Sequence, residues 1–216
     1  MKKIFTIAAI AVLGMTSVNA QDVNFGAKAG VNFATVTGDE TDDFESKTGF
    51  HVGVVAEIML SDKFSFQPEL VYSSQGTKIS ESGTEDFGGI TYQYEEEATR
   101  KLDYLNLPLM AKYYVSEGLS IEAGPQIGFL INSEAEYEYS ATYEGTTESE
   151  SETEDLKDYT SSIDFGFNFG LGYKLENGLN FGARYNLGLS NINDFEGSDD
   201  VKNQNAVFQV SVGFFF

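Results

Sequence analysis

The chain of 216 residues contains no cysteine, no tryptophan, one histidine and only three prolines. Without cysteine, disulfide frameworks, cysteine-zinc sites, cysteine nucleophiles and cysteine-anchored lipoproteins are excluded. A single histidine excludes two-histidine metal sites. Basic residues are also scarce, with 13 Lys and Arg against 34 Asp and Glu. A net charge of −21 argues against a nucleic-acid partner, because neutralising phosphates needs clustered basic residues. Nothing in the composition indicates a cofactor, and we expect none.

The first twenty residues have the pattern of a secretory signal peptide. Lys2 and Lys3 precede an apolar run over residues 4–15, and small residues ending at Ala20 occupy the usual cleavage positions. The run is too short to cross a bilayer as a helix. We therefore predict that residues 1–20 direct export and are removed, and that residues 21–216 form one domain.

The rest of the chain is rich in glycine and aromatic residues and alternates with a period of two. Apolar positions 25, 27, 29, 31 and 33 interleave with small or polar ones, which indicates a strand with one apolar face. The pattern recurs at residues 50–60, 64–72, 105–113, 119–131, 163–173, 179–189 and 206–216. Short connections (61–63, 116–118, 175–178) alternate with long polar ones (36–48, 76–101, 133–161, 190–205). This predicts an all-β fold, an eight-stranded antiparallel up-and-down barrel.

The composition of the two faces decides between a soluble and a membrane barrel. A soluble barrel encloses its apolar face around a ligand, whereas a membrane barrel turns that face to lipid. Here the other face is dominated by Gly, Asn, Ser and Gln, which suits a narrow interior better than a soluble exterior. The bulky apolar face would also overfill so small a lumen. Each segment has about the 9–11 residues that a tilted transmembrane strand needs. We therefore predict a transmembrane β-barrel.

Aromatic residues and prolines refine this prediction. Aromatics near the segment ends are typical of the interfacial girdles of membrane barrels.

Pro68 and Pro108 lie inside two segments, although proline removes a donor from the hydrogen-bond ladder. We expect a bulge or local break near each. A bulge would shift the inside–outside phase by one, so the face assignments beyond Pro68 and around residues 104–108 depend on which of the two occurs.

An even number of strands places both termini on one side of the membrane. The short turns share that side and the four long connections share the other. In outer-membrane barrels the short turns are periplasmic and the long loops are extracellular. We expect the same orientation here, in the bacterial outer membrane.

Several stretches carry a family resemblance. They are QPELVYS at 67–73, LDYLNLPL at 102–109, AGPQIG at 123–128, DFG at 164–166 with GLGY at 170–173, and ARYNLGLSNI at 183–192. With the signal peptide, they resemble the small outer-membrane β-barrel family often labelled "porin family protein", common in the Bacteroidota. The resemblance covers nearly all of residues 21–216 and implies an OmpA/OmpX-like eight-stranded barrel. Its motifs are specific for the fold and carry no information about activity. Phe214 and Phe216, at the end of the last alternating segment, resemble the signal read by the barrel assembly machinery.

Seven charged residues fall on the face predicted to be interior. An unpaired charge in a narrow lumen is costly, so we expect ion pairs, forming either a structural network that fills the lumen or the lining of an ion-selective path. His51 is predicted to be a polar lumen residue, and no catalytic arrangement is indicated. The seven are Lys28, Glu57, Glu69, Lys112, Glu122, Asp164 and Arg184.

The long connections hold 25 of the 34 acidic residues. They form either a solvated repulsive surface or weak divalent-cation sites, near residues 39–43 or 148–155. No run has the spacing of an EF-hand loop. Alternation also continues past the apolar run at residues 91–94 and 134–139. This predicts that the fourth to sixth segments (105–113, 119–131 and 163–173) project from the membrane as a ribbon whose edge could add a partner's strand.

These observations predict a non-enzymatic outer-membrane barrel with a structural and surface-interaction role. The alternative is a narrow porin-like channel for small solutes or ions. Expected partners are outer-membrane lipid, the barrel assembly machinery and surface proteins or divalent cations at the acidic loops, but not nucleic acid.

Overall fold

The fold is nine β-strands and one short 3₁₀ helix, seen in a computed structural model that describes residues 23–87, 90–143, 146–198 and 200–216. The predicted signal peptide lies outside these residues. Within them, no helix is long and apolar enough to cross a membrane. The elements are β1 (Val23–Gly38), β2 (Glu45–Met59), β3 (Phe64–Phe87), β4 (Ile90–Tyr114), β5 (Leu119–Tyr143), β6 (Thr146–Asp155), η2 (Lys157–Tyr159), β7 (Ile163–Lys174), β8 (Leu179–Gly188) and β9 (Asn203–Phe215).

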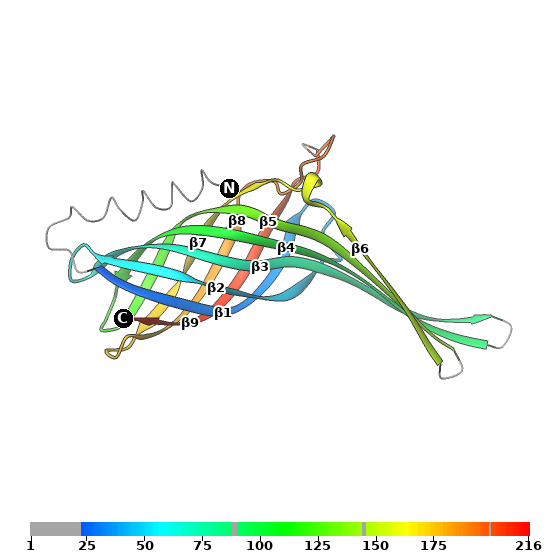
Figure 1. Ribbon diagram of the computed structural model, residues 1–216, viewed down its shortest axis with the longest axis horizontal. Helices are drawn as coiled ribbons and strands as arrows, with labels where there is room; N and C mark the ends of the chain where they lie inside the picture. The colour runs from blue at the N-terminus through cyan, green and yellow to red at the C-terminus, as the bar shows by residue number, and fades with distance from the viewer. Residues whose placement is uncertain (1–22, 88–89, 144–145, 199) are drawn as a thin grey trace.

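Eight of the strands close into a ring. The order is β4-β3-β2-β1-β9-β8-β7-β5, and a β4–β5 pairing joins the two ends. Every pairing is antiparallel, and β1 pairs with β9 from Gly26 to Gly38. Figure 1 shows the tilted strands of this barrel, with the short turns at one end. The predicted eight-stranded up-and-down barrel is confirmed. Closure is needed in lipid, where an open sheet edge finds no hydrogen-bond partner.

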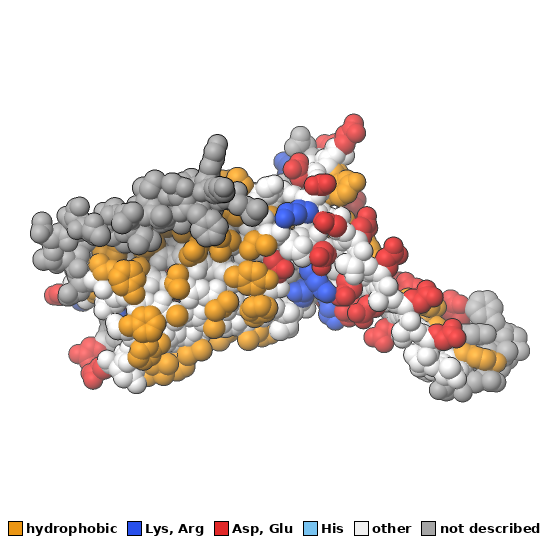
Figure 2. Space-filling view, in the orientation of Figure 1, with side chains coloured by type: hydrophobic (Ala, Val, Ile, Leu, Met, Phe, Trp, Pro, Cys, Tyr) orange, Lys and Arg blue, Asp and Glu red, His pale blue; other side chains and the backbone are white. Residues whose placement is uncertain are grey.

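The apolar face of the barrel points outward. Phe25, Val54, Phe167 and Leu171 are between 41% and 58% exposed, although each is apolar. Figure 2 shows such side chains spread over the barrel wall. Neighbouring strands pair aromatics on this surface, as in Phe50 with Tyr72, Phe64 with Tyr113 and Phe169 with Tyr185. A surface of this kind is stable only against hydrocarbon, as the alternation predicted.

The prolines interrupt pairing without moving the strands. Pro68 pairs with Leu109, and the β3–β4 ladder resumes in the same register at Val71. The β4–β5 ladder likewise skips from Pro108 to Ala111 without a shift. The expected local break is therefore confirmed at both prolines, and it is confined to a few ladder positions without a change of register.

The register shifts at two places nearer the long-loop end. One shift lies between Ser46 and His51, and the other lies between Asp103 and Tyr104, at the border of the 104–108 stretch where a bulge would change the phase. At the second, Asp103 pairs with Asn132 and Tyr104 with Leu130, so Ile131 has no partner in that ladder. The extra residue changes which positions of β5 face inward beyond the membrane band.

Three strands of the barrel continue far beyond it. The outer halves of β3, β4 and β5 remain paired, and β6 adds to β5 from Glu134↔Asp155 to Tyr143↔Thr146. They form a four-stranded sheet of residues 76–87, 90–101, 134–143 and 146–155, named here the projecting sheet. It extends to the right in Figure 1. The connection expected at 76–101 is thus formed by the outer parts of β3 and β4, and the one at 133–161 contains the outer part of β5 and all of β6. The ribbon prediction is wrong for the sixth segment, because β7 begins at Ile163 and does not extend.

Gly76 lies where β3 leaves the barrel. Its φ of +129° is a backbone conformation that residues with a Cβ rarely adopt. Beyond it, β2 pairs with β3 only at Glu45 and Ser46. The glycine therefore marks the point at which β3 passes from the barrel wall to the projecting sheet.

Candidate functional site

Glu69 is the centre of a buried ion cluster that spans the lumen. Its carboxylate accepts two hydrogen bonds from Arg184, Nη1 to Oε2 at 3.0 Å and Nη2 to Oε1 at 2.8 Å, and also binds Lys28. Arg184 Nη2 lies 3.1 Å from Glu122 Oε1. β3 and β8 stand four strands apart in the ring of eight, so the Glu69–Arg184 pair crosses the barrel from wall to wall.

Glu57 is the centre of a second cluster nearer the short turns. Its carboxylate lies 3.2 Å from Lys112 and 2.8 Å from Lys174, and it accepts hydrogen bonds from Tyr114 and Ser65. Lys112 also donates to Gln67, which in turn donates to Glu69, so the two clusters are linked. Sequence reasoning missed Lys174, although its position one residue past the apolar Tyr173 carries the signal of an inward phase.

Asp164 stands apart from both clusters, nearer the long loops. It accepts hydrogen bonds from Ser190 at 2.7 Å and Asn205 at 3.1 Å, neither of which is charged. His51 is 1% exposed and its Nδ1 contacts Asn32 Oδ1 at 2.8 Å. The seven interior charges predicted from the sequence are each at most 9% exposed, and the structure brings all of them except Asp164 into the linked clusters. Whether they serve structure or conduction remains a prediction.

Apolar side chains seal the lumen at its long-loop end. Val36, Leu102, Tyr104 and Ile192 form a cluster in which no member is more than 2% exposed. Ile192 belongs to the loop between β8 and β9, which folds into the barrel mouth and is held there by the bridge Thr160↔Asn193. We name these four residues the apolar plug. Below it, the cavity between the two ion clusters measures about 30 Å³, the room of roughly one water molecule.

The three phenylalanines at positions 214–216 point alternately to the outer surface and into the lumen. Phe214 and Phe216 are 45% and 82% exposed on the outer surface, whereas Phe215 is 6% exposed and packs its ring 4.4 Å from Lys174 Nζ inside the lumen. The amide of Phe216 donates to the carbonyl of Phe25, which joins the described ends of the barrel. The predicted assembly role of Phe214 and Phe216 is not tested by this geometry.

The projecting sheet carries an unbalanced charge. Residues 79–98 and 137–156 contain thirteen Asp and Glu and no Lys or Arg. Figure 2 shows the acidic side chains gathered over this part of the molecule. Some face each other directly, since Glu81 pairs with Glu96 and Glu97 with Glu138. Like charges directly opposite one another destabilise a sheet, and of these four glutamates only Glu97 contacts a basic side chain, that of Lys78, among the described residues.

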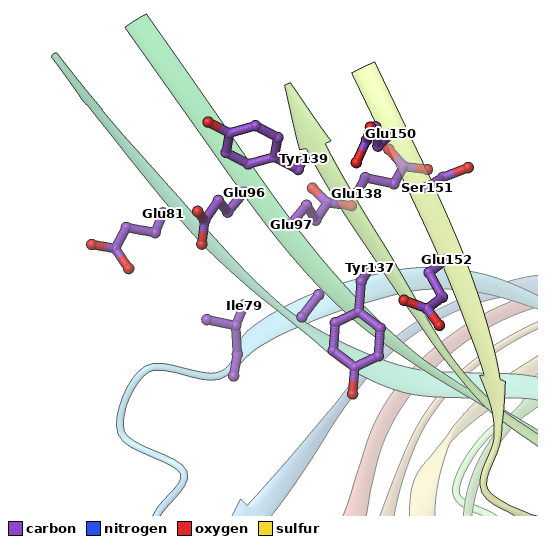
Figure 3. A pocket seen from close by; sticks show the side chains of 11 residues that line it. Ile79, Glu81, Glu96, Glu97, Tyr137, Glu138, Tyr139, Glu150, Ser151 and Glu152 are labelled. Atoms are coloured by element: carbon purple, nitrogen blue, oxygen red, sulfur yellow. The ribbon is translucent and has the colours of Figure 1, made fainter. Parts of the chain in front are cut away.

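An open groove of about 760 Å³ lies on the projecting sheet. All four strands contribute to it, and Figure 3 shows Tyr137 and Tyr139 among glutamates of the neighbouring strands. The two tyrosines are 47% and 44% exposed. Its lining residues are Ile79, Glu81, Glu96, Glu97, Ala98, Tyr137, Glu138, Tyr139, Glu150, Ser151 and Glu152.

Three ion pairs lie at the base of the projecting sheet. Lys78 Nζ lies 3.5 Å from Glu45 and 3.3 Å from Glu97, and Lys101 pairs with Glu136. The hydrogen bond to Glu97 raises the pKa of Lys78. Partial burial opposes ionisation of Glu97, but the hydrogen bonds from Lys78, Thr99 and Ser80 and the charge of Lys78 together lower the pKa of that carboxyl. These contacts attach the sheet to the barrel rim.

The expected divalent-cation sites find no support in the described residues. Among them, no group of three or more acidic or histidine side chains is arranged to hold a metal ion. The acids of β6 alternate with Ser and Thr along an exposed strand and do not converge.

Comparison with known proteins agrees with the barrel. A family model described as an outer membrane protein beta-barrel domain matches residues 19–194. Similar solved structures include Ail of Yersinia pestis (13% identity, 90% of this chain and 99% of that chain, TM-score 0.42) and Neisserial surface protein A (14%, 90% and 99%, 0.43). OprG of Pseudomonas aeruginosa is another (10%, 91% and 97%, 0.42). No curated protein sequence matches this chain. At such identities the likeness concerns the fold alone.

Proposed function

This chain belongs to the outer-membrane β-barrel family, and on that premise we propose a closed, non-catalytic barrel that holds an acidic sheet at the cell surface for interaction with partners. The observation that carries the proposal is the continuation of β3, β4 and β5 beyond the barrel, with β6 added. Such a sheet has no role in closing the barrel. Ordering these residues costs backbone conformational entropy. A role in binding partners at a distance from the membrane would explain why the sheet is kept in spite of that cost.

The filled lumen supports the closed state. The ion clusters, the cavity of about 30 Å³ and the apolar plug lie one above another along the barrel. A hydrated ion would have to break buried salt bridges at one level and enter an apolar layer at another. The porin-like alternative therefore has no specific observation in its favour among the described residues. Reproducible single-channel steps in planar bilayers would overturn the closed state, and we expect none.

The orientation follows from the family pattern. We propose that the short turns and both termini are periplasmic and that the projecting sheet is extracellular. Residues 1–20 act as the export signal and residues 21–216 as the mature barrel, and Phe214 with Phe216 are read by the assembly machinery. Amino-terminal sequencing of the membrane-inserted protein should begin at Gln21. Protease added to intact cells should cleave the projecting sheet and spare the barrel.

A shortened variant tests the surface role. Ile79, Ala98, Tyr137 and Glu152 form one row across the sheet. Replacing residues 80–97 and 138–151 each by Asn-Gly, which favours a tight two-residue hairpin turn, removes the sheet above that row. We expect the shortened protein to keep the mobility shift between unboiled and boiled samples that marks a folded barrel.

Selection from a displayed random-peptide library then compares the full and shortened proteins in detergent. We expect peptides that the full protein enriches and the shortened one does not. Identical enrichment by both proteins would contradict a role for the projecting sheet in binding.

A further inference from the structure

β6 forms a free edge of the projecting sheet. β6 pairs with β5 along all ten of its residues, and in the described part of the chain no strand lies on its other side. All ten residues are exposed. Natural edge strands are usually protected by shortness, proline, a bulge or charged side chains. β6 is ten residues long and has no proline or bulge, so its outer backbone groups are available, while its acidic side chains disfavour any added strand that is not basic.

The side chains of β6 restrict which strand fits. Glu148, Glu150, Glu152 and Glu154 alternate with Ser and Thr, so all four glutamates share one face of the sheet. A strand added to this edge places its own side chains about 5 Å from them. A second copy of β6 would bring glutamate against glutamate. Basic residues at every second position would instead pair with all four carboxylates.

The other free edge is a poorer match. The outer half of β3 carries Glu81 and Glu85 but also Ile79 and Gly83 on the same face, and at its base Lys78 already neutralises Glu45 and Glu97. β6 has the denser and more regular array of acids, and no basic residue lies within it.

We propose that β6 recognises an extended basic segment of a partner protein, with Lys or Arg at alternate positions, by adding it as a fifth strand to the projecting sheet. This deepens the proposed function and rests on it. Backbone hydrogen bonds to the β6 edge supply part of the affinity, and the alternating charges supply the selectivity. The net charge of −21 also draws a basic segment toward the sheet over distances longer than contact.

Four synthetic peptides test the inference against the full-length protein in detergent. Alternating (Lys-Thr)₄ matches β6, and a block peptide of four Lys followed by four Thr has the same composition without the alternation. (Lys-Pro)₄ keeps the charge and spacing but cannot pair as a strand, and (Glu-Thr)₄ mimics a second copy of β6. We expect (Lys-Thr)₄ to bind at least about tenfold more tightly than the others, given cross-strand pairs of a few tenths to about one kcal/mol each.

A matched pair of variants locates the binding. E148Q/E150Q/E152Q/E154Q removes the four charges of β6, and E81Q/E85Q/E95Q/E96Q removes four charges from β3 and β4 of the same sheet. We expect (Lys-Thr)₄ binding to fall about tenfold in the first and less than about threefold in the second, in the same ionic strength. Circular dichroism and gel mobility verify that both variants fold.

Five results of these experiments would overturn the inference. Equal binding of (Lys-Pro)₄ would replace strand addition by unspecific charge attraction, and tight binding of (Glu-Thr)₄ would favour self-association. Equal losses in the two variants would remove β6 from the site. If (Lys-Thr)₄ binding persists in the shortened protein, the inference fails. A library enrichment that needs the sheet but yields no alternating basic peptides also overturns it, and leaves the proposed function standing.

Discussion

The barrel and the projecting sheet share three strands but treat charge in opposite ways. Inside the barrel, Glu57 and Glu69 each contact two basic side chains, and their side chains are 0% exposed. In the sheet, Glu81 faces Glu96 with no basic residue in the same row. A buried charge left without a partner costs several kcal/mol, whereas water and salt screen an exposed one. The acidic side chains at the centre of the lumen are therefore paired and buried, whereas Glu81 and Glu96 of the projecting sheet are exposed to solvent.

Breaking the central ion cluster should give the largest effect. Glu69→Gln leaves Lys28 and Arg184 buried with reduced compensation, and we expect the free energy of unfolding to fall by about 3–5 kcal/mol. Urea unfolding in lipid vesicles, followed by gel mobility, measures this loss. Glu95→Gln on the exposed sheet is the control and should change stability by less than about 0.5 kcal/mol. Similar losses in the two variants would refute the contrast between the regions.

The second largest effect on stability is expected when a charge is placed on the outer surface of the barrel. Val54→Arg puts a guanidinium against lipid near the middle of β2, with an expected cost of about 2–4 kcal/mol. Tyr139→Arg puts the same side chain on the projecting sheet, where water surrounds it, and should leave barrel stability unchanged. The same unfolding assay compares them. A tolerated arginine at position 54 would argue against contact with hydrocarbon there.

The smallest effect is expected at the Lys78 ion pairs. The raised pKa of Lys78 means that its contribution is present below pH 10.5 and is lost as pH rises through the folded-state value. The lowered pKa of Glu97 means that its contribution is present above pH 4.5 and is lost as pH falls. The base of the sheet should thus open more readily outside this window, while the barrel stays intact.

Hydrogen exchange at the amides of Ser80 and Thr99, corrected for its intrinsic pH dependence, reports this opening. Lys78→Met should remove the basic transition and weaken the acidic one, because Thr99 and Ser80 still donate hydrogen bonds to Glu97. A basic transition that survives in Lys78→Met would assign it to other groups.

The barrel was predictable because lipid imposes a strict rule on each strand separately. Alternation alone placed Phe50, Val52 and Val54 on the outer face and Glu57 on the inner one, and the structure agrees. No such rule acts above the membrane. Residues 146–155 alternate Glu with Ser and Thr, so they have no apolar face by which a strand could be recognised. Only their pairing with β5 makes them one.

The sequence predicts which residues lie in the lumen better than it predicts which of them contact one another. The sequence indicates that charges lie inside, but Glu69 meets Arg184 across 115 positions because closure and strand tilt bring them to one level. The isolation of Asp164 from basic residues, and the entry of Ile192 into the barrel mouth, depend on how a loop folds back. Local patterns carry no information on either.

The unbroken length of β4, 25 residues, has a mechanical consequence. At about 3.3 Å per residue it runs for roughly 80 Å, from the short-turn end of the barrel to the tip of the projecting sheet. A force applied at the tip along the strands would load many hydrogen bonds of the ladders in shear simultaneously, instead of breaking them one by one. Under the proposed role, tension from a bound partner would therefore reach the barrel wall through the strands themselves.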